Sequence, residues 1–71
     1  MEKPELIIIG ASEHAKVVID IFEKSGSYKL IGLIDTFKPT GFEVADNYVL
    51  GDEHSIPALL NQYPDLHYFI A

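Results

Sequence analysis

The feature that most constrains the fold is the segment of residues 6–18, where an apolar run passes through a short turn into a helical pattern. Residues 6–9 are four consecutive aliphatic residues, typical of a strand that is covered on both faces of a parallel sheet. Gly10 gives the backbone freedom for a tight turn, and the Ser12 hydroxyl is a suitable helix N-cap. Such a turn directs unpaired N–H groups and the positive end of a helix dipole to one point, which predicts an anion site.

The helix predicted after this turn has one apolar face and one charged face. Apolar residues recur at intervals of three and four, at Ala15, Val18, Ile19 and Phe22. On the other face, Asp20 precedes Lys24 by one helical turn, which is the favourable order for an ion pair. Gly26 is a natural stop, so we expect the helix to end near Ser25.

Residues 28–34 alternate loosely and then become apolar, which predicts a second strand. Because a helix of crossover length separates the two strands, they should be parallel and form a right-handed βαβ unit. Asp35 follows the second strand at the same edge of the sheet as the Gly10 turn. We therefore expect the Asp35 side chain to face the turn.

The loop that follows spans residues 36–47 and is long enough to be functional or mobile. Its two aromatic residues, Phe37 and Phe42, indicate that it folds back onto the domain. Residues 48–50 then predict a brief third strand, and residues 66–71 predict a fourth.

A second, shorter helix is predicted between the third and fourth strands. Asp52 and Ser55 compete as its N-cap, and Pro57 favours Ser55 because proline is tolerated only in a first turn. Pro64 blocks continuation, so the helix should end near Asn61. Its inward residues are expected to be Ile56, Leu59 and Leu60.

Together these elements predict the α/β fold class: one small Rossmann-like domain over residues 1–71, with a parallel sheet of about four strands and two helices. A 71-residue chain can form such a domain with little excess stability, because small domains bury a small share of their surface. The chain stops at Ala71 directly after a predicted strand, so we expect a fragment of a longer protein.

Charge and composition disfavour several classes of function. The formal net charge is -6 and the five Lys and Arg residues are scattered, so neither nucleic acid nor an anionic membrane is an expected partner. No apolar run approaches the length of a membrane span, and the first residues lack the pattern of a signal peptide. The chain contains no cysteine, which excludes disulfides and thiolate sites. A cytoplasmic location is expected.

The turn matches the dinucleotide-binding fingerprint in part. Gly10, Ala15 and Asp35 fit the pattern, but Ser12 stands in place of the second glycine, which disfavours NAD. His14 lies in the first helical turn, where the dipole favours a neutral imidazole that can donate to a phosphate or a sugar hydroxyl. The alternative interpretation of His14 is an ordinary surface histidine.

The sequence predicts no catalytic residue and no metal site. No pair of carboxylates has a spacing that indicates acid–base catalysis, and the serines lack a neighbouring base. Asp52, Glu53 and His54 are adjacent, but no second cluster completes a metal shell. We expect Asp52 and Glu53 to be solvated, and His54 and His67 to be structural.

Residues 7–20, 32–35 and 49–51 resemble the N-terminal domain of bacterial sugar acetyltransferases, and the resemblance covers nearly the whole chain. This family includes sialic-acid O-acetyltransferases and UDP-4-amino-sugar N-acetyltransferases of surface-glycan synthesis. The residues that match its turn-and-helix motif are Gly10, Ala11, Ser12, His14, Lys16, Val17 and Val18.

The resemblance implies a small Rossmann-like domain that holds a nucleotide sugar of the UDP type. The implied substrate-binding residues are Gly10, Ala11, Ser12, Glu13, His14 and Asp35. In the family, a left-handed β-helix domain follows, forms a homotrimer, binds acetyl-CoA and carries the catalytic histidine. This chain lacks that domain, so it is expected to hold no cofactor and to transfer no acetyl group on its own.

Two positions depart from the family motif. Glu13 stands where glycine is usual, and its carboxylate occupies the position that would approach an anionic diphosphate. Thr36 stands where an acidic residue or asparagine is common. Two alternatives therefore remain: a structural or interaction domain that has lost its ligand, and a partial dinucleotide-binding domain.

Overall fold

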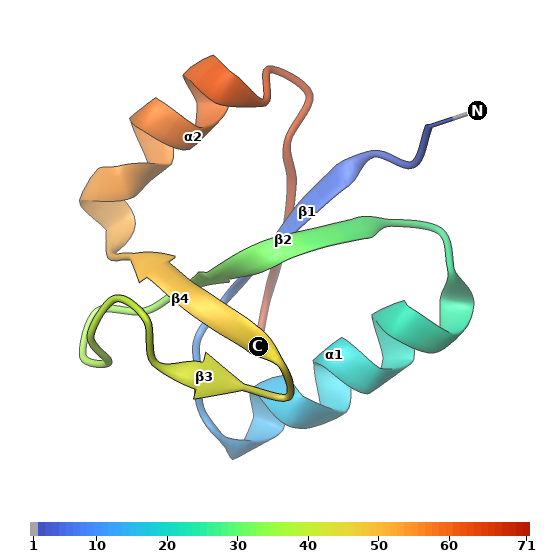
Figure 1. The fold of residues 1–71 in the computed structure, drawn as a ribbon, viewed down its shortest axis with the longest axis horizontal. Helices are drawn as coiled ribbons and strands as arrows, with labels where there is room; N and C mark the ends of the chain where they lie inside the picture. Colours follow the sequence, from blue (N-terminus) through green and yellow to red (C-terminus); the bar gives the residue numbers. More distant parts are fainter. Residues whose placement is uncertain (1) are drawn as a thin grey trace.

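The computed structural model describes residues 2–71 as a sheet with one helix on each face (Figure 1). The elements in chain order are β1 (Glu5–Ile9), α1 (Glu13–Ser25), β2 (Lys29–Ile34), β3 (Glu43–Val44), β4 (Asn47–Gly51), the 3₁₀ helix η1 (Glu53–Ser55), α2 (Ile56–Gln62) and β5 (His67–Ile70). The predicted α/β fold class is confirmed.

The five strands form one sheet in the order β3-β4-β2-β1-β5. The pairs β1–β2, β1–β5 and β2–β4 are parallel, as the βαβ unit requires. The sheet contains one strand more than predicted, because β3 pairs antiparallel with β4 inside the segment expected to be a loop. A strand of two residues is too short to show the alternation by which strands are recognised.

Both faces of β1 are buried, which explains why its sequence is apolar without alternation. Ile8 faces α1 and belongs to the main core cluster. Ile7 and Ile9 point to the opposite face, where they line an apolar groove together with Ile56 and Leu60 of α2. The buried partners of Ile8 in the core are Ala11, Ala15, Val18, Ile19, Leu33, Val44 and Val49.

The structure of α1 agrees closely with the helix predicted from the sequence. Its apolar stripe is buried, and the Lys24 ammonium lies 3.0 Å from the Asp20 carboxylate on the solvent side. Gly26 adopts a left-handed conformation, with φ of 67°, and its N–H donates to the Phe22 carbonyl to end the helix. Phe22 of α1 also makes an edge-to-face contact with Phe69 of β5, with ring centroids 5.4 Å apart.

Ser55 occupies the N-cap position of α2 as predicted, but the capping hydrogen bond is made by Asp52 and not by Ser55. Asp52 accepts a hydrogen bond from the His54 N–H at 2.9 Å, and a 3₁₀ turn leads from there into α2. Ser55 itself has a helical backbone conformation and makes no capping bond. Because η1 and α2 are continuous, the unpaired N–H groups that need a cap lie one turn earlier than Pro57 suggested. Leu60 is also 44% exposed and not fully inward as expected.

The loop after β2 folds back through its backbone and not through Phe37. The Gly41 N–H donates to the Val49 carbonyl at 2.8 Å, and the Val49 N–H donates to the Phe42 carbonyl at 2.9 Å. Phe42 is about one-third exposed, at 37%, and the Lys38 ammonium lies over its ring, 4.7 Å from the centroid. Phe37 is 91% exposed, so the expectation that its side chain packs onto the domain was wrong.

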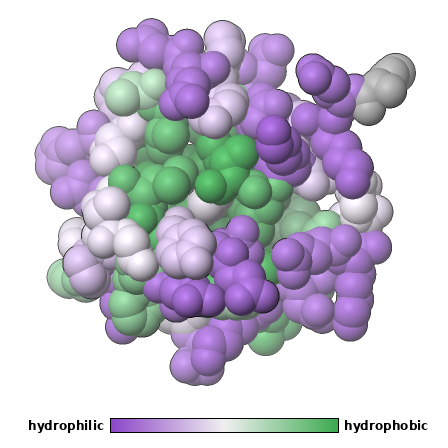
Figure 2. Space-filling view, in the orientation of Figure 1, coloured by the Kyte–Doolittle hydropathy of each residue, from purple (hydrophilic) through white to green (hydrophobic). Residues whose placement is uncertain are grey.

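The surface of the domain combines hydrophilic margins with exposed apolar side chains. Figure 2 shows apolar residues gathered in the middle of the view, surrounded by hydrophilic ones. All four residues of the edge strand β5 are exposed. In the part of the chain described, residues 2–71, neither helix has the length and apolar character needed to cross a membrane.

Candidate functional site

The turn between β1 and α1 is held against the end of β2. Gly10 has φ of 111°, a conformation that residues with a side chain rarely adopt. The Gly10 N–H donates to the Ile34 carbonyl at 2.7 Å, which fixes the start of the turn. A Cβ at this position would lie only 3.3 Å from the Ala71 carbonyl oxygen. Glycine is therefore required here by both conformation and space.

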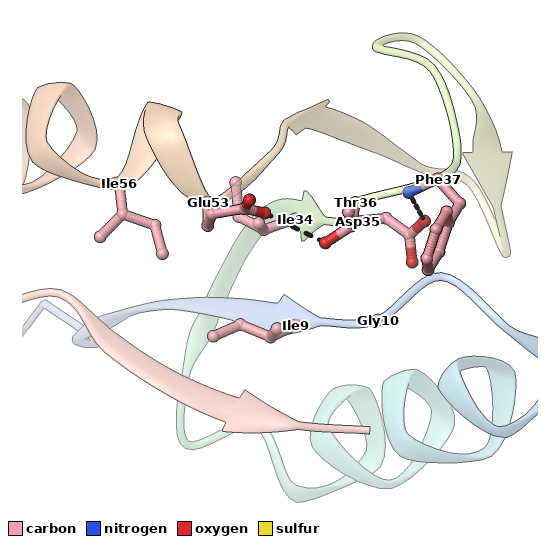
Figure 3. A pocket seen from close by; sticks show the side chains of 8 residues that line it. All are labelled: Ile9, Gly10, Ile34, Asp35, Thr36, Phe37, Glu53 and Ile56. Carbon is pink, nitrogen blue, oxygen red and sulfur yellow. Dashed lines mark hydrogen bonds between the residues drawn. The ribbon is translucent and has the colours of Figure 1, made fainter.

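Asp35 joins this turn to the loop after β2. One carboxylate oxygen, Oδ1, accepts a hydrogen bond from the Ala11 N–H at 2.9 Å. The other oxygen, Oδ2, accepts from the Phe37 N–H at 2.9 Å (Figure 3) and from the Lys38 N–H at 2.7 Å. The prediction that Asp35 faces the turn is confirmed, and the carboxylate acts as a clamp between two loops at one sheet edge.

These contacts favour the ionised form of Asp35. Partial burial acts to raise the pKa of Asp35, but the backbone hydrogen bonds from Lys38, Ala11 and Phe37, together with the Lys38 charge, outweigh it. The net effect is a pKa below the ordinary value of 3.8. Asp35 is therefore a carboxylate, and an acceptor of hydrogen bonds, at any pH near neutrality.

The N-terminus of α1 begins at this clamp, but its side-chain cap differs from the prediction. Ser12 occupies the N-cap position with an extended backbone, yet its hydroxyl makes no capping hydrogen bond. The Ala15 N–H donates instead to the Ser12 carbonyl at 3.0 Å. No side-chain hydrogen bond caps the start of the helix, and the dipole of a 13-residue helix favours an anion beside it.

Glu13 forms an ion pair with Lys16 on the surface of α1. The Lys16 ammonium lies 3.2 Å from one Glu13 carboxylate oxygen and 3.3 Å from the other. The Glu13 side chain is 89% exposed and that of Lys16 is 56% exposed, so the pair contributes little to stability. Its consequence is electrostatic, since Glu13 partly neutralises a lysine that lines the cleft beside the start of the helix.

Two clefts are lined in part by residues of the turn. The cleft that we call the Asp35 cleft has a volume of about 240 Å³, an apolar floor and a polar rim. The floor consists of Ile9, Ile34 and Ile56, and the rim of Gly10, Asp35, Thr36, Phe37 and Glu53.

The second cleft, which we call the Lys38 cleft, has a volume of about 350 Å³ and contains both lysines of this region. It is lined by Ala11, Ser12, Glu13, Lys16, Lys38, Phe42, Glu43 and Val44. Each cleft is therefore lined by two carboxylates, but among the residues described only the second also has lysines, beside the helix N-terminus.

The structure brings together five of the six predicted binding residues at these two clefts. Gly10 and Asp35 line the first, and Ala11, Ser12 and Glu13 line the second. His14 is exposed and is not among the residues that line either cleft. The roles of all six residues in binding stay predictions.

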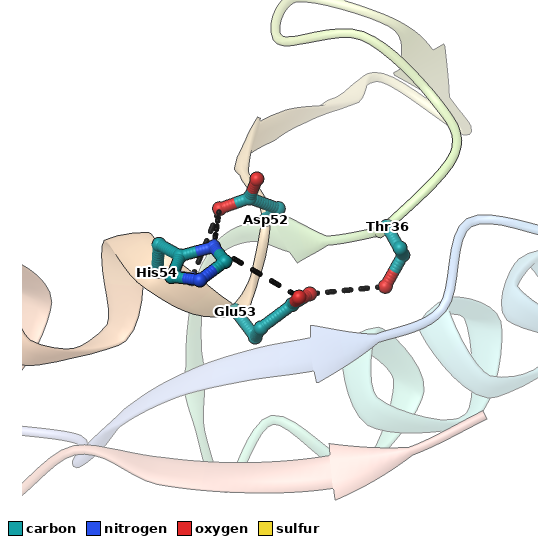
Figure 4. Close-up of polar contacts among 4 residues, drawn as sticks. All are labelled: Thr36, Asp52, Glu53 and His54. Atoms are coloured by element: carbon teal, nitrogen blue, oxygen red, sulfur yellow. Dashed lines mark hydrogen bonds and ion pairs between the residues drawn. The ribbon is translucent and has the colours of Figure 1, made fainter.

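Sequence reasoning missed a polar cluster at the same edge of the sheet. The Thr36 hydroxyl donates to Glu53 Oε2 at 3.0 Å, and Glu53 lines the Asp35 cleft (Figure 4). Beside it, His54 Nδ1 lies 3.4 Å from Asp52 Oδ1. The signal was present, because Asp52 and Glu53 follow β4, whose carboxyl end lies at the edge where Asp35 ends β2. Within residues 2–71, no group of three or more such side chains is arranged to hold a metal ion.

The family assignment follows from a comparison that covers nearly the whole chain. The family described as the PglD N-terminal domain matches residues 5–71, a range that includes the turn, the Asp35 clamp and both clefts. The chain belongs to this family. Comparison with curated proteins and with solved structures found no match. The PglD N-terminal domain family accounts for the resemblance to sugar acetyltransferases, and the particular kind of sugar acetyltransferase stays a prediction.

Proposed function

We propose that this PglD N-terminal domain binds the nucleotide sugar that a sugar acetyltransferase modifies. The observation that carries the proposal is the Asp35 clamp, which fixes the Gly10 turn and the start of α1 as one rigid edge. A helix N-terminus without a side-chain cap suits a diphosphate at this edge, and Lys16 and Lys38 offset the two carboxylates of the adjoining cleft.

The finer parts of the proposal rest on the family resemblance. The nucleotide is of the UDP type, and the sugar belongs to surface-glycan or sialic-acid synthesis. Acetyl-CoA would bind to a separate β-helix domain, which would also form the homotrimer. The role of the present chain is to bind and orient the substrate.

The direct test is isothermal titration calorimetry of the purified chain with UDP and with UDP-amino sugars. We expect saturable binding of both, with the Asp35→Asn variant as the comparison in which the clamp is broken. Absence of binding to every UDP compound would favour the alternative, a structural or interaction domain that has lost its ligand.

The purified 71-residue chain is expected to transfer no acetyl group from acetyl-CoA to an amino sugar. The physical reason is that neither of the two clefts described is lined by a histidine that could act as general base. The measurement is thiol release from acetyl-CoA, with a preparation from cells that lack the protein as the control. Turnover above that control would contradict the prediction that this chain binds the substrate without transferring the acetyl group.

Glu13→Gly is expected to tighten the binding of UDP by about two- to fivefold at low salt. The change removes a carboxylate beside the helix N-terminus and releases the Lys16 ammonium from its ion pair, so both effects favour a diphosphate. Titration calorimetry measures the affinity. Glu13→Gln should act in the same direction while keeping the length of the side chain.

The matched control for Glu13 is Glu23→Gln, which makes the same change of charge near the other end of α1. Ten residues of helix separate the two positions by about 15 Å, so Glu23 should have little effect on a bound phosphate. If Glu13→Gly left the UDP affinity unchanged while the control behaved as wild type, the diphosphate would not lie beside Glu13.

A further inference from the structure

The acceptor capacity of Asp35 is largely used within the protein. An ionised carboxylate has two oxygens and roughly four lone-pair sites. Three of these accept from the N–H groups of Ala11, Phe37 and Lys38. In dinucleotide-binding sheets, the acidic residue after the second strand accepts from a ribose hydroxyl. Here Asp35 occupies that place in the chain but has little capacity left for a ligand.

Glu53 lines the same cleft and retains free acceptor capacity. Its Oε2 accepts one hydrogen bond, from the Thr36 hydroxyl at 3.0 Å. Its Oε1 lies 3.9 Å from His54 Nδ1, which is too far for a hydrogen bond. The side chain is 55% exposed, so the carboxylate can reach a ligand without leaving its partner. Figure 3 shows Glu53 above the apolar floor, with Asp35 directed away toward the Phe37 N–H.

Several contacts hold Glu53 in this position. The Asp35 N–H donates to the Gly51 carbonyl at 3.0 Å, which joins the ends of β2 and β4. Asp52 then caps the 3₁₀ turn that carries Glu53, through the His54 N–H. The Thr36 hydroxyl, directly after the end of β2, donates to the carboxylate and orients it (Figure 4). The acceptor is thus preorganised, which lowers the entropic cost of binding.

We infer that Glu53, and not Asp35, accepts the hydrogen bonds of the ribose hydroxyls of the bound nucleotide. This inference rests on the proposed function. The Asp35 cleft, at about 240 Å³, suits the nucleoside end of the ligand, and its isoleucine floor suits the apolar faces of the rings. Its two carboxylates repel phosphate and no lysine of residues 2–71 lines it, whereas in the Lys38 cleft Lys16 and Lys38 offset the charge of Glu13 and Glu43. The difference in charge therefore favours the Asp35 cleft for the ribose and the Lys38 cleft for the diphosphate.

The test compares UDP with 2′,3′-dideoxy-UDP, which lacks both ribose hydroxyls, by titration calorimetry of the 71-residue chain. For the wild type, loss of a charge-assisted hydrogen bond predicts binding at least about tenfold weaker for the dideoxy compound. In Glu53→Ala this ratio should fall to near one, because UDP loses affinity while the dideoxy compound does not. Thr36→Val, which keeps the carboxylate but removes its orienting donor, should give an intermediate ratio.

The control is Glu23→Ala, which removes an equal charge from a remote surface of α1 and should keep the wild-type ratio. Circular dichroism and thermal unfolding verify that each variant is folded. A wild-type ratio in folded Glu53→Ala, or equal affinity of the wild type for both compounds, would overturn the role of Glu53 alone. Absence of UDP binding to the wild type would overturn the proposed function, and this inference with it.

Discussion

Gly32→Ala is expected to lower the free energy of unfolding by about 3 kcal/mol, a large part of the stability of so small a domain. A Cβ on Gly32 would lie 2.6 Å from Leu50 Cγ and 2.9 Å from the Tyr48 carbonyl oxygen. The first atom belongs to a side chain that can move, but the second belongs to the backbone of β4. The two neighbouring strands would have to separate to admit a methyl group.

The matched control is Gly41→Ala, because Gly41 has φ of 91° and its Cβ would meet no atom within 4 Å. This change carries only the conformational cost, about 1 kcal/mol. Urea denaturation followed by circular dichroism measures both variants. Equal destabilisation of the two would show that β4 accommodates the methyl group at no cost.

Gly32 matters for the site as well as for stability. It lies in β2, and the pairing of β2 with β4 places the loops that carry Asp35 and Glu53 at one edge. If the strands separate, the distance between Thr36 and Glu53 should lengthen and their hydrogen bond should be lost. Gly32→Ala should therefore also weaken UDP binding in whatever fraction of the protein stays folded.

The elements with a strong periodic signal could be predicted from the sequence. Helix α1 ends at Ser25 as expected, because its apolar stripe, its charged face and Gly26 all indicate the same structure. The uniform apolar run of β1 likewise predicted a strand with two buried faces. In each case local sequence and tertiary packing favour one conformation.

The errors fell at short elements and turns that have no periodic pattern of their own. The pairing of β3 with β4 depends on a turn through Ala45 and Asp46, both of which have positive φ, and no local pattern indicates it. The Asp52 cap replaced the Ser55 cap because a 3₁₀ turn extends the second helix backward. Phe37 is exposed because Asp35 fixes the backbone of the loop, so its aromatic ring did not have to provide the anchor.

The candidate site could likewise be predicted only in part. The position of Asp35 opposite the turn followed from strand order, since parallel strands bring their carboxyl ends to one edge. The role proposed for Glu53 could not be predicted in this way. It depends on how many hydrogen bonds each carboxylate already accepts within the protein, which only the structure shows. Asp35 stands at the place expected of a ligand-binding carboxylate but accepts hydrogen bonds from the backbone. Glu53, at the same edge of the sheet, is then the carboxylate left to bind the ligand.

Asp35→Asn is expected to destabilise the protein by about 2 kcal/mol near neutral pH and to weaken UDP binding by at least tenfold. The amide has one acceptor oxygen in place of two, and its NH₂ group would face backbone N–H donors. Either the Ala11 N–H or the pair from Phe37 and Lys38 would lose its acceptor. The turn and the loop would no longer be held together, so the start of α1 would lose its fixed place beside both clefts.

The pH dependence distinguishes this clamp from an ordinary surface carboxylate. Because the pKa of Asp35 is lower in the folded protein than its usual 3.8, the ionised form stabilises the fold, and this contribution is fully present above that value. It is lost as the pH falls through the folded pKa, so the stability difference between wild type and Asp35→Asn should be constant near neutrality and shrink below about pH 4. Urea denaturation at a series of pH values measures it, with the exposed Asp65→Asn as the control. A difference that persists unchanged into strong acid would show that Asp35 acts through its shape and not through its charge.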